Sequence, residues 1–263
     1  MKKYLYTAAQ QQNIEKQFNR ELGASNLLLI RRAAEAVIQE VLFRWPKSIK
    51  VTFYCGSGKN SADGLIVAGL LANRGFLIKV VMVGEKSKFC TEVAIAMRFC
   101  KQTNAEFVAD HDIGEEDLIV DAIFGTGLNR KVSGVHLKAI EKINKSQKPV
   151  LAIDIPSGLS ADDGTILGEA VRAHRTLSLV VRKKGLYTGK GSSVAGKVIC
   201  NDLNIPPKFF HPTNTHLLQI DECLLEIPER DKDARKTAFG HVLVVGGEYG
   251  MGGAVIMAAE AAF

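Results

Sequence analysis

Oxygen-bearing side chains stand beside three glycine-rich turns of the chain. They are Asn60 and Asp63 after Gly56-Ser57-Gly58, Asp121 before Gly125-Thr126-Gly127, and Asp154 with Ser157 before Gly158. A carboxylate that is partly removed from water has its pKa raised toward neutrality, as a general acid or base requires. The amide, carboxylate and hydroxyl oxygens of Asn60, Asp121 and Ser157 suit an s-block cation better than zinc. These residues therefore predict proton transfer and the binding of a hard cation.

Each of these side chains also has an ordinary structural interpretation. Asp121 or Asp154 alone is equally consistent with an acid that caps the following helix or turn. Asn60 and Ser157 are suited to hydrogen bonds within turns. Because both acids follow apolar strand residues and both precede glycine turns, the two together favour a functional site.

The stretch 51–75 predicts how the first turn is built. Residues 51–55 read VTFYC, which is typical of a strand buried on both faces, and Leu65 to Ala72 follow with helical spacing. The glycine turn between them lets the backbone approach a ligand, because no side chain intervenes. A strand, a glycine turn and a helix direct free N–H groups and the positive end of the helix dipole at an anion. We interpret this stretch as a phosphate- or nucleotide-binding loop.

Apolar runs and helical patterns alternate along the first 160 residues. The expected strands are 51–55, 77–83, 118–123 and 150–153, and the expected helices are 7–18, 26–43, 65–72, 87–102 (capped by Ser87) and 135–144. Such alternation predicts an α/β fold, a Rossmann-like three-layer sandwich with a mostly parallel sheet. The first two helices cover the sheet or form a dimer face. Ligands bind beyond the carboxyl ends of parallel strands, so the polar residues of the three turns should converge there.

The pattern changes after Gly164. Shorter strands are expected at 175–181, 196–200 and 219–220, extending one edge of the sheet, and Gly185, Gly189 and Gly191 mark a loop that would rim the site. From Phe239 the chain predicts a strand (242–245), a glycine-rich turn and the start of a helix. One such βα unit cannot bury both its faces. We therefore expect a first domain over residues 1–225, and a linker with the incomplete start of a second domain over 226–263.

Composition excludes several classes of protein. The net charge of +6 suits an anionic partner, but the lysines and arginines are scattered, which argues against nucleic acid. Five cysteines without metal spacing indicate reduced thiols, and no apolar run approaches a membrane span, so a cytoplasmic protein is expected. The fingerprint G-x-G-x-x-G fails at Ser61, which disfavours an oxidoreductase with a free dinucleotide. Motifs of zinc hydrolases, esterases and P-loop ATPases are not met.

Four segments resemble, in order and spacing, those of the NAD(P)H-hydrate epimerases, also called the YjeF N-terminal family. They are Tyr6-Thr7-Ala8, GSGKNSADG (56–64), DAIFGTGLNR (121–130) and AIDIPSGLSADDG (152–164). DAIFGTG and DIPSG at their separation are the most specific part of a resemblance that runs from about Tyr4 to Pro206. The segment GGEYGMGGAVIMAAEAA (246–262) resembles the opening of the ADP-dependent NAD(P)H-hydrate dehydratase domain, which has a ribokinase-like fold. Epimerase followed by dehydratase is the order of the bifunctional nicotinamide nucleotide repair enzymes of bacteria, so the resemblance implies that this chain is a truncated form of them.

The family interconverts the R and S epimers of hydrated NADH and NADPH, which carry water at C6 of the nicotinamide ring. The resemblance implies that Asp154 acts at the reacting ring and that Asn60, Asp121 and Ser157 hold a potassium ion. It implies that the substrate contacts Asp154 and two loops, namely Lys59, Asn60, Ser61, Ala62 and Asp63, and Gly125, Thr126, Gly127, Leu128, Asn129, Arg130 and Lys131. The implied partners are this small molecule and further copies of the chain in a homo-oligomer. ADP or ATP would serve only the missing dehydratase part.

The chain departs from the family's loop, GxGNNGGDG. Lys59 replaces the first Asn, and Ser61-Ala62 replace the paired glycines. Added Cβ atoms would strain a turn with positive φ or crowd the phosphates, at a cost of about 1–2 kcal/mol each. Arg31 and Ala34 likewise stand where Glu and Gly are usual. Two functions are left open: an epimerase, and a catalytically impaired nucleotide-binding or scaffold protein that keeps the fold.

Overall fold

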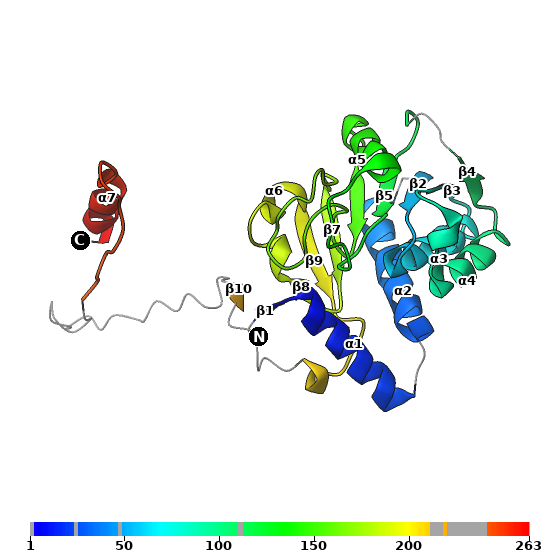
Figure 1. Ribbon diagram of the computed structural model, residues 1–263, viewed down its shortest axis with the longest axis horizontal. Coiled ribbons are helices and arrows are strands. Elements are labelled where there is room, and N and C mark those ends of the chain that lie inside the picture. The colour runs from blue at the N-terminus through cyan, green and yellow to red at the C-terminus, as the bar shows by residue number, and fades with distance from the viewer. Residues whose placement is uncertain are drawn as a thin grey trace. The chain divides into compact units, whose positions relative to one another are not determined.

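The computed structural model describes residues 3–23, 26–46, 49–109, 113–210, 218–219 and 241–262 of the chain. The chain divides into two compact units, residues 1–219 and 220–263, and each is described by itself (Figure 1). The domain boundary expected at residues 225–226 and the thiol of Cys223 lie outside the described residues. That boundary stays a prediction.

A seven-stranded sheet forms the middle layer of the first unit. In spatial order its strands are β4 (Glu106–Val108), β3 (Leu77–Met82), β2 (Lys50–Cys55), β5 (Leu118–Ala122), β6 (Val150–Ile153), β7 (Arg175–Leu179) and β9 (Lys197–Asn201). Every neighbouring pair runs parallel. The predicted α/β fold is confirmed. From β2 the chain adds β3 and β4 on one side and then β5, β6, β7 and β9 on the other, so the direction of strand addition reverses between β2 and β5. Parallel sheets bind ligands at such a point.

Helices cover both faces of this sheet. The first face carries α1 (Ala8–Leu22), α2 (Asn26–Arg44), α3 (Lys59–Ala72) and α4 (Thr91–Cys100), whose buried apolar residues form one core with Phe53 and Val80. The second face carries α5 (Gly134–Lys145), whose Ile140 and Ile143 pack in a separate core with Tyr54. Because successive residues of a strand point to opposite faces, Phe53 and Tyr54 belong to different cores.

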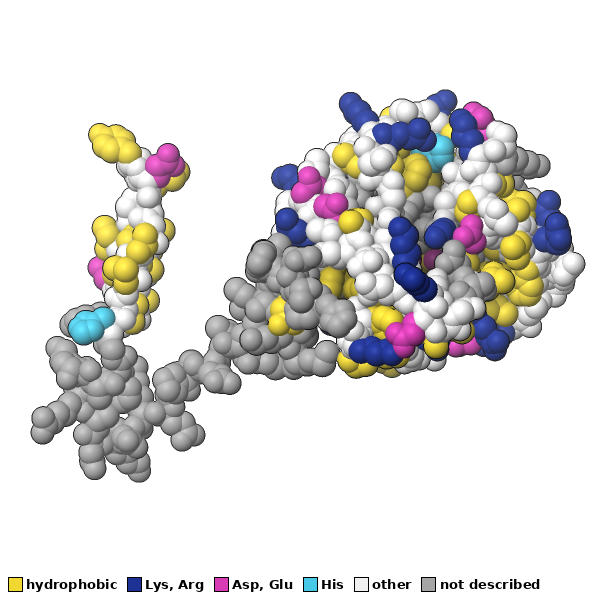
Figure 2. All heavy atoms as spheres, turned by 60° about the horizontal axis from the view of Figure 1, so that its bottom comes forward, with side chains coloured by type: hydrophobic (Ala, Val, Ile, Leu, Met, Phe, Trp, Pro, Cys, Tyr) yellow, Lys and Arg dark blue, Asp and Glu magenta, His cyan; other side chains and the backbone are white. Residues whose placement is uncertain are grey.

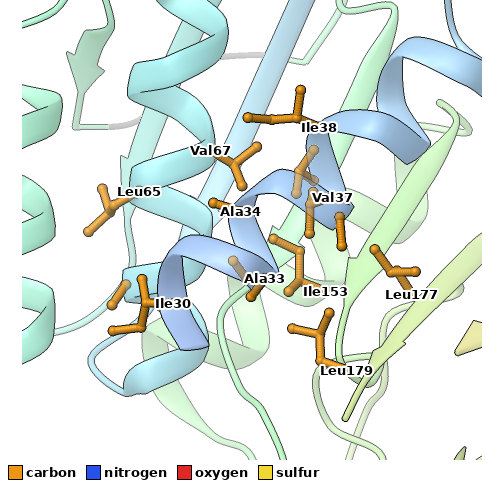
Figure 3. Packing of buried hydrophobic residues seen from close by; sticks show 14 of the residues in the cluster. Ile30, Ala33, Ala34, Val37, Ile38, Leu65, Val67, Ile153, Leu177 and Leu179 are labelled. Atoms are coloured by element: carbon orange, nitrogen blue, oxygen red, sulfur yellow. The ribbon is translucent and has the colours of Figure 1, made fainter. Parts of the chain in front are cut away.

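The helix α2 lies beside α3 on the first face of the sheet and also contacts β7. Figure 3 shows Ala34 beside Val67 of α3, while Ala33 and Val37 lie toward Ile153 of β6 and the leucines of β7. Ala34 is wholly buried, so a methyl group at this position fits the contact between the helices. The expectation that α2 covers the sheet is confirmed. The homo-oligomer stays a prediction.

A second, smaller sheet was not expected from the sequence. In it β1 (Lys3–Tyr6) pairs in parallel with β8 (Arg182–Lys183) and antiparallel with β10 (Leu218–Gln219). The expectation that residues 219–220 extend the main sheet is therefore wrong for Gln219, and Ile220 lies outside the described residues. The chain leaves the main sheet after β7 through Val180, whose φ of 66° turns it toward β1.

Several helix and strand limits differ from the expected ones. Helix α3 begins at Lys59 rather than near Leu65, so the polar residues after the glycine turn are helical. Helix α4 is capped by Cys90, whereas Ser87 lies in the 3₁₀ turn Lys86–Lys88, so Ser87 is not the cap. The three-residue strand β4 was missed because it is too short and too exposed for a clear pattern. The remaining short elements are α6 (Gly191–Val194) and the 3₁₀ turns Lys184–Leu186 and Pro207–Phe209.

The described part of the second unit contains one helix, α7 (Gly253–Ala262). The strand expected at 242–245 is not formed, because a strand needs a neighbour to pair with and these residues have none among the described ones. Val242, Leu243 and Val245 are at least 75% exposed. The ribokinase-like assignment of this unit stays a prediction.

Three features of the described residues bear on the expectations from composition. On the face shown in Figure 2, Lys and Arg side chains are spread among other types rather than gathered in a stripe. Among the described residues, no helix is long and apolar enough to cross a membrane. Cys55, Cys90, Cys100 and Cys200 are free thiols.

Candidate active site

A cavity of about 610 Å³ opens at the carboxyl ends of β2, β5 and β6, beside the point where the strand order reverses. The loops after these strands line one side of it, and α1 and α2 line the other. The lining residues are Gln11, Gln12, Glu15, Lys16, Asn19, Leu29, Ile30, Ala33, Ser57, Gly58, Lys59, Asn60, Asp63, Ile123 through Arg130, Asp154, Leu179, Val180 and Leu203. The structure thus brings most of the predicted site residues to one place.

The first loop presents a helix N-terminus to the cavity. Gly58 is the N-cap of α3 in an extended conformation, and no side chain caps the helix there. The first N–H groups of a helix have no partner within it, so they are available to an anion. The exposed Lys59 adds a positive charge at the same place. This loop fits the predicted anion-binding role.

Ser61 and Ala62 lie elsewhere than expected. Both are wholly buried inside α3, and neither lines the cavity. Neither is among the described residues with positive φ, so the expected strain is not there. Ser61 Oγ instead accepts a hydrogen bond from Gly56 N (2.6 Å) and donates one to Ala122 O (2.6 Å). The serine thereby joins the ends of β2 and β5. The expectation that the side chains of Ser61 and Ala62 would crowd the phosphates is wrong, because both are buried away from the cavity.

Asn60 holds the loops after β5 and β6 together. Its Nδ2 donates to Phe124 O (2.8 Å) and to Ile153 O (3.1 Å). These two bonds fix which way the amide points, and they leave Oδ1 buried without a hydrogen-bond partner. An unpaired buried oxygen is costly, and a cation is one group that would satisfy it.

Asp121 and Ser157 form a second buried polar pair. Ser157 donates from N to Asp121 Oδ2 (2.8 Å) and from Oγ to Asp121 Oδ1 (2.6 Å), while Ser157 Oγ accepts from Phe124 N (2.8 Å). Burial raises the pKa of Asp121 to about 6, and the hydrogen bonds from Ser157 oppose this rise. Both residues are wholly buried, so they act through the loops and are not exposed to a substrate.

Asp154 is at the wall of the cavity, in an unusual backbone conformation. Its φ is 71°, and its N–H donates to Leu177 O (2.8 Å). Its Oδ1 accepts from Leu179 N (3.1 Å) and forms an ion pair with the wholly buried Lys183. Its Oδ2 would lie 3.7 Å from a Cβ atom built on Gly125, which lines the cavity. One oxygen is thus held by the protein, and the other is on the side of the cavity.

Three carboxyl groups share this cavity. Burial raises the pKa of Asp63 well above its ordinary value, and the charges of Asp154 and Glu15 raise it further. Burial also raises the pKa of Glu15, against a hydrogen bond from Gln11 Nε2 (2.7 Å). These rises in pKa shift Asp63, and to a lesser degree Glu15, toward the neutral form beside an Asp154 that is paired with a cation. An acid in its neutral form next to a paired carboxylate can donate a proton.

The second predicted loop is divided between two cavities. Gly125 through Arg130 line the cavity described above, whereas Lys131 lines a neighbouring one. A Cβ atom on Gly125 would come within 3.1 Å of Asn60 Cβ, so a larger residue there would press on Asn60.

The chain is similar to several known proteins. Residues 26–185 match the family model described as YjeF-related protein N-terminus. The chain belongs to this family. The NAD(P)H-hydrate epimerase of Limosilactobacillus fermentum is 34% identical over 197 residues, which cover 74% of this chain and 95% of that protein. The bifunctional NAD(P)H-hydrate repair enzyme Nnr of Coxiella burnetii is 38% identical over 246 residues, 92% of this chain and 50% of that protein.

The chain spans about half the length of the bifunctional relatives that it matches. The crystal structure of the yeast protein ynu0 (YNL200c) superposes with a TM-score of 0.65, covering 78% of this chain and 91% of that one. At 22% identity this likeness shows that the two share the fold of the YjeF-related N-terminus.

Lys183 and Glu15 are among the charged residues of this YjeF-related site that the sequence analysis missed. Lys183 follows the apolar strand 175–181 at the carboxyl edge of the sheet, which is the same pattern that singled out Asp121 and Asp154. Glu15 lies on the polar helix α1, and nothing in its spacing indicated that this helix reaches the cavity. The first could have been found from the sequence, and the second could not.

The glycine loop 185–191 does not rim the cavity. A Cβ atom on Gly185 would collide with Ser160 O, and one on Gly189 with Asp163 O. These glycines are needed because the loop packs its backbone against that of residues 160–164. The expectation that Gly185, Gly189 and Gly191 border the site is wrong.

Glycine is required at position 56 because the backbone directly after β5 lies close to it, and not because a ligand does. A Cβ atom there would collide with Ile123 O, whereas one on Gly58 would meet open space. We expect Gly56→Ala to lower the free energy of unfolding by about 1–3 kcal/mol through overpacking. Gly58→Ala, the matched control, should cost less than about 1 kcal/mol as an N-cap change. Urea unfolding of both variants checks this, and equal midpoints for Gly56→Ala and the parent chain would contradict it.

Proposed function

We propose that this chain interconverts the R and S epimers of hydrated NADH and NADPH. The observation that carries the proposal is the position of Asp154, which is paired with Lys183 through one oxygen and has its other oxygen on the side of a cavity that a helix N-terminus borders. The name of the Limosilactobacillus relative, of which the chain covers 95%, supports this activity.

The chemistry requires a proton to move at one oxygen. Epimerisation at C6 breaks the C6–O bond and re-forms it on the other face of the ring. While the bond is broken, the lone pair of the ring nitrogen forms a double bond to C6. The leaving hydroxyl takes a proton and departs as water, and the returning water gives a proton back. We propose that Asp154 exchanges this proton and that Asp63, whose neutral form is favoured, is the second acid of the site.

We also propose that Asn60, Asp121 and Ser157 hold a potassium ion. The unpaired Asn60 Oδ1 supports this, and so does the adjacent carboxylate–hydroxyl pair, since hard oxygen ligands suit an alkali cation. A bound potassium ion supplies positive charge that joins the three loops and reduces repulsion between the carboxylates.

The alternative, an impaired nucleotide-binding protein, was drawn from the replacements at Lys59, Ser61-Ala62, Arg31 and Ala34. Ser61 and Ala62 are accommodated inside the helix without positive φ, and Ser61 forms two hydrogen bonds. This removes strain at Ser61 and Ala62 as a reason for impairment and favours the epimerase.

For residues 220–263 we propose the beginning of a dehydratase domain. The Coxiella relative, named as bifunctional, aligns with 92% of this chain over half of its own length. The helix α7 is the part of the expected unit that is formed.

The test starts from one purified epimer of hydrated NADPH and follows the other by chromatography. The chain should bring the two to equilibrium faster than buffer alone, and the rate should fall when sodium replaces potassium. A rate no different from that of buffer in potassium would refute the epimerase. Equal rates in the two salts would refute the potassium site while leaving the activity in place.

A further inference from the structure

A second cavity, of about 790 Å³, lies on the opposite face of the sheet from the first. Its floor includes Tyr54, Val81 and Val83, which belong to the core on the α5 side, whereas Leu29 and Ile30 beside the first cavity belong to the core on the α2 side. Its wall is the first half of α5. The cavity is thus above the carboxyl ends of β2 and β3, where the sequence offered only Gly84-Glu85.

The two cavities meet at the edge of the sheet. Ser57, Phe124, Leu128 and Arg130 line both of them. These residues come from the loops after β2 and β5, at the point where the strand order reverses. An elongated ligand can therefore cross this edge and occupy both cavities.

The two cavities differ in charge. The first is balanced, because its three carboxyl groups are matched by three basic side chains, namely Glu15, Asp63 and Asp154 with Lys16, Lys59 and Arg130. The second is lined by five basic side chains and one acid, namely Lys88, Arg130, Lys131, Lys138 and Lys142 with Glu85. Glu85 pairs with Lys88 (3.1 Å), so it offsets one of these cations. The anionic end of a ligand belongs in the second cavity.

The second cavity is also lined by two ring side chains that pack against each other. Phe124 and His136 lie with their ring centroids 5.0 Å apart at 31°, beside the apolar floor. Gly84 has a φ of 106°, and a Cβ atom on it would come within 3.0 Å of His136 Nε2, so the glycine gives the imidazole room. Burial and the charges of Arg130 and Lys88 lower the pKa of His136, which favours the neutral ring. An aromatic base is suited to such surroundings.

We propose that the second cavity binds the adenosine half of the hydrated dinucleotide, with its basic rim around the 2′-phosphate, so that the chain prefers hydrated NADPH to hydrated NADH. The inference rests on the proposed function for the identity of the whole substrate. In dinucleotide-binding sheets an acid after the second strand holds the free ribose hydroxyls, and a nearby basic residue accommodates the 2′-phosphate. Here the acid after β3 is Glu85, which is paired with Lys88, and basic side chains prevail around it.

The test is a binding measurement that needs no turnover. By titration calorimetry, adenosine 2′,5′-bisphosphate should bind at least about tenfold more tightly than adenosine 5′-monophosphate, as expected for a charge-assisted phosphate contact. Replacing two cations of the rim together, Lys138→Gln with Lys142→Gln, should remove this difference. Lys145→Gln is the matched control, because Lys145 lies on the same helix but does not line the second cavity. Equal affinity for the two nucleotides, or an unchanged ratio in the double variant, would overturn the inference.

Kinetics separate this inference from the proposed function. In the double variant the KM for hydrated NADPH should rise about tenfold with kcat unchanged, while the KM for hydrated NADH stays the same. Epimerisation without any preference between the two hydrates would overturn the inference alone. Preferential binding of the bisphosphate by a chain that does not epimerise would support the second cavity and refute the proposed function.

Discussion

Asp154→Asn is expected to lower the rate of epimerisation by about 10²–10⁴-fold, the range found when a positioned acid or base is removed. An amide has nearly the same shape as the carboxylate but cannot exchange a proton at C6. Asparagine is the right replacement because it tolerates the positive φ of this position, where alanine would add strain. The measurement is the rate of approach to equilibrium from one epimer.

Asp163→Asn is the matched control for this loss. Asp163 lies in the same segment of chain, outside the cavity, where its Oδ1 accepts from Thr165 N (2.9 Å). An asparagine can accept the same bond, so the rate should stay within about twofold of the parent chain. An Asp154→Asn variant that kept more than a tenth of the parent rate would show that the proton is exchanged elsewhere, with Asp63 as the first candidate.

The sheet could be predicted because four of its strands are largely apolar runs, and its polar edge because Asp121 is the last residue but one of β5 and Asp154 directly follows β6. A parallel sheet brings such ends together whatever the loops do. Contacts between distant segments could not be predicted in the same way. Glu15 reaches the cavity through the packing of α1 against the first core, which no local pattern encodes.

The loop of α3 shows how a resemblance can mislead about strain. The family's paired glycines suggested a turn with positive φ, so Ser61 and Ala62 were expected to be strained. In this chain α3 begins at Lys59, two residues before Ser61, so both residues have helical backbone angles. A helical backbone accepts any side chain for which there is room. Whether a side chain fits depends on the neighbours, and Ser61 is accommodated by Gly56 and Ala122.

Lys183→Met is expected to lower the free energy of unfolding by about 3–5 kcal/mol, because it leaves the buried carboxylate of Asp154 without its cation. Ser178 Oγ (3.2 Å) and Leu179 O (2.6 Å) lose their hydrogen bonds from Nζ as well. Urea unfolding measures the change. Lys190→Met, an exposed lysine nearby, should alter the stability by less than about 0.5 kcal/mol.

The double variant Asp154→Asn with Lys183→Met separates the contribution of this ion pair to stability from the part that Asp154 plays in proton exchange. Each single variant leaves one buried charge without its partner, whereas the double variant leaves none. The double variant should therefore be more stable than the sum of the two single losses predicts, with a coupling of about 0.5–3 kcal/mol. Epimerisation should stay as low as in Asp154→Asn alone, because the proton-exchanging oxygen is still missing. Additive losses of stability would mean that the ion pair does not hold Asp154 in place. Recovered stability without recovered activity would show that Lys183 positions the acid and that the loss of activity is chemical rather than a consequence of unfolding.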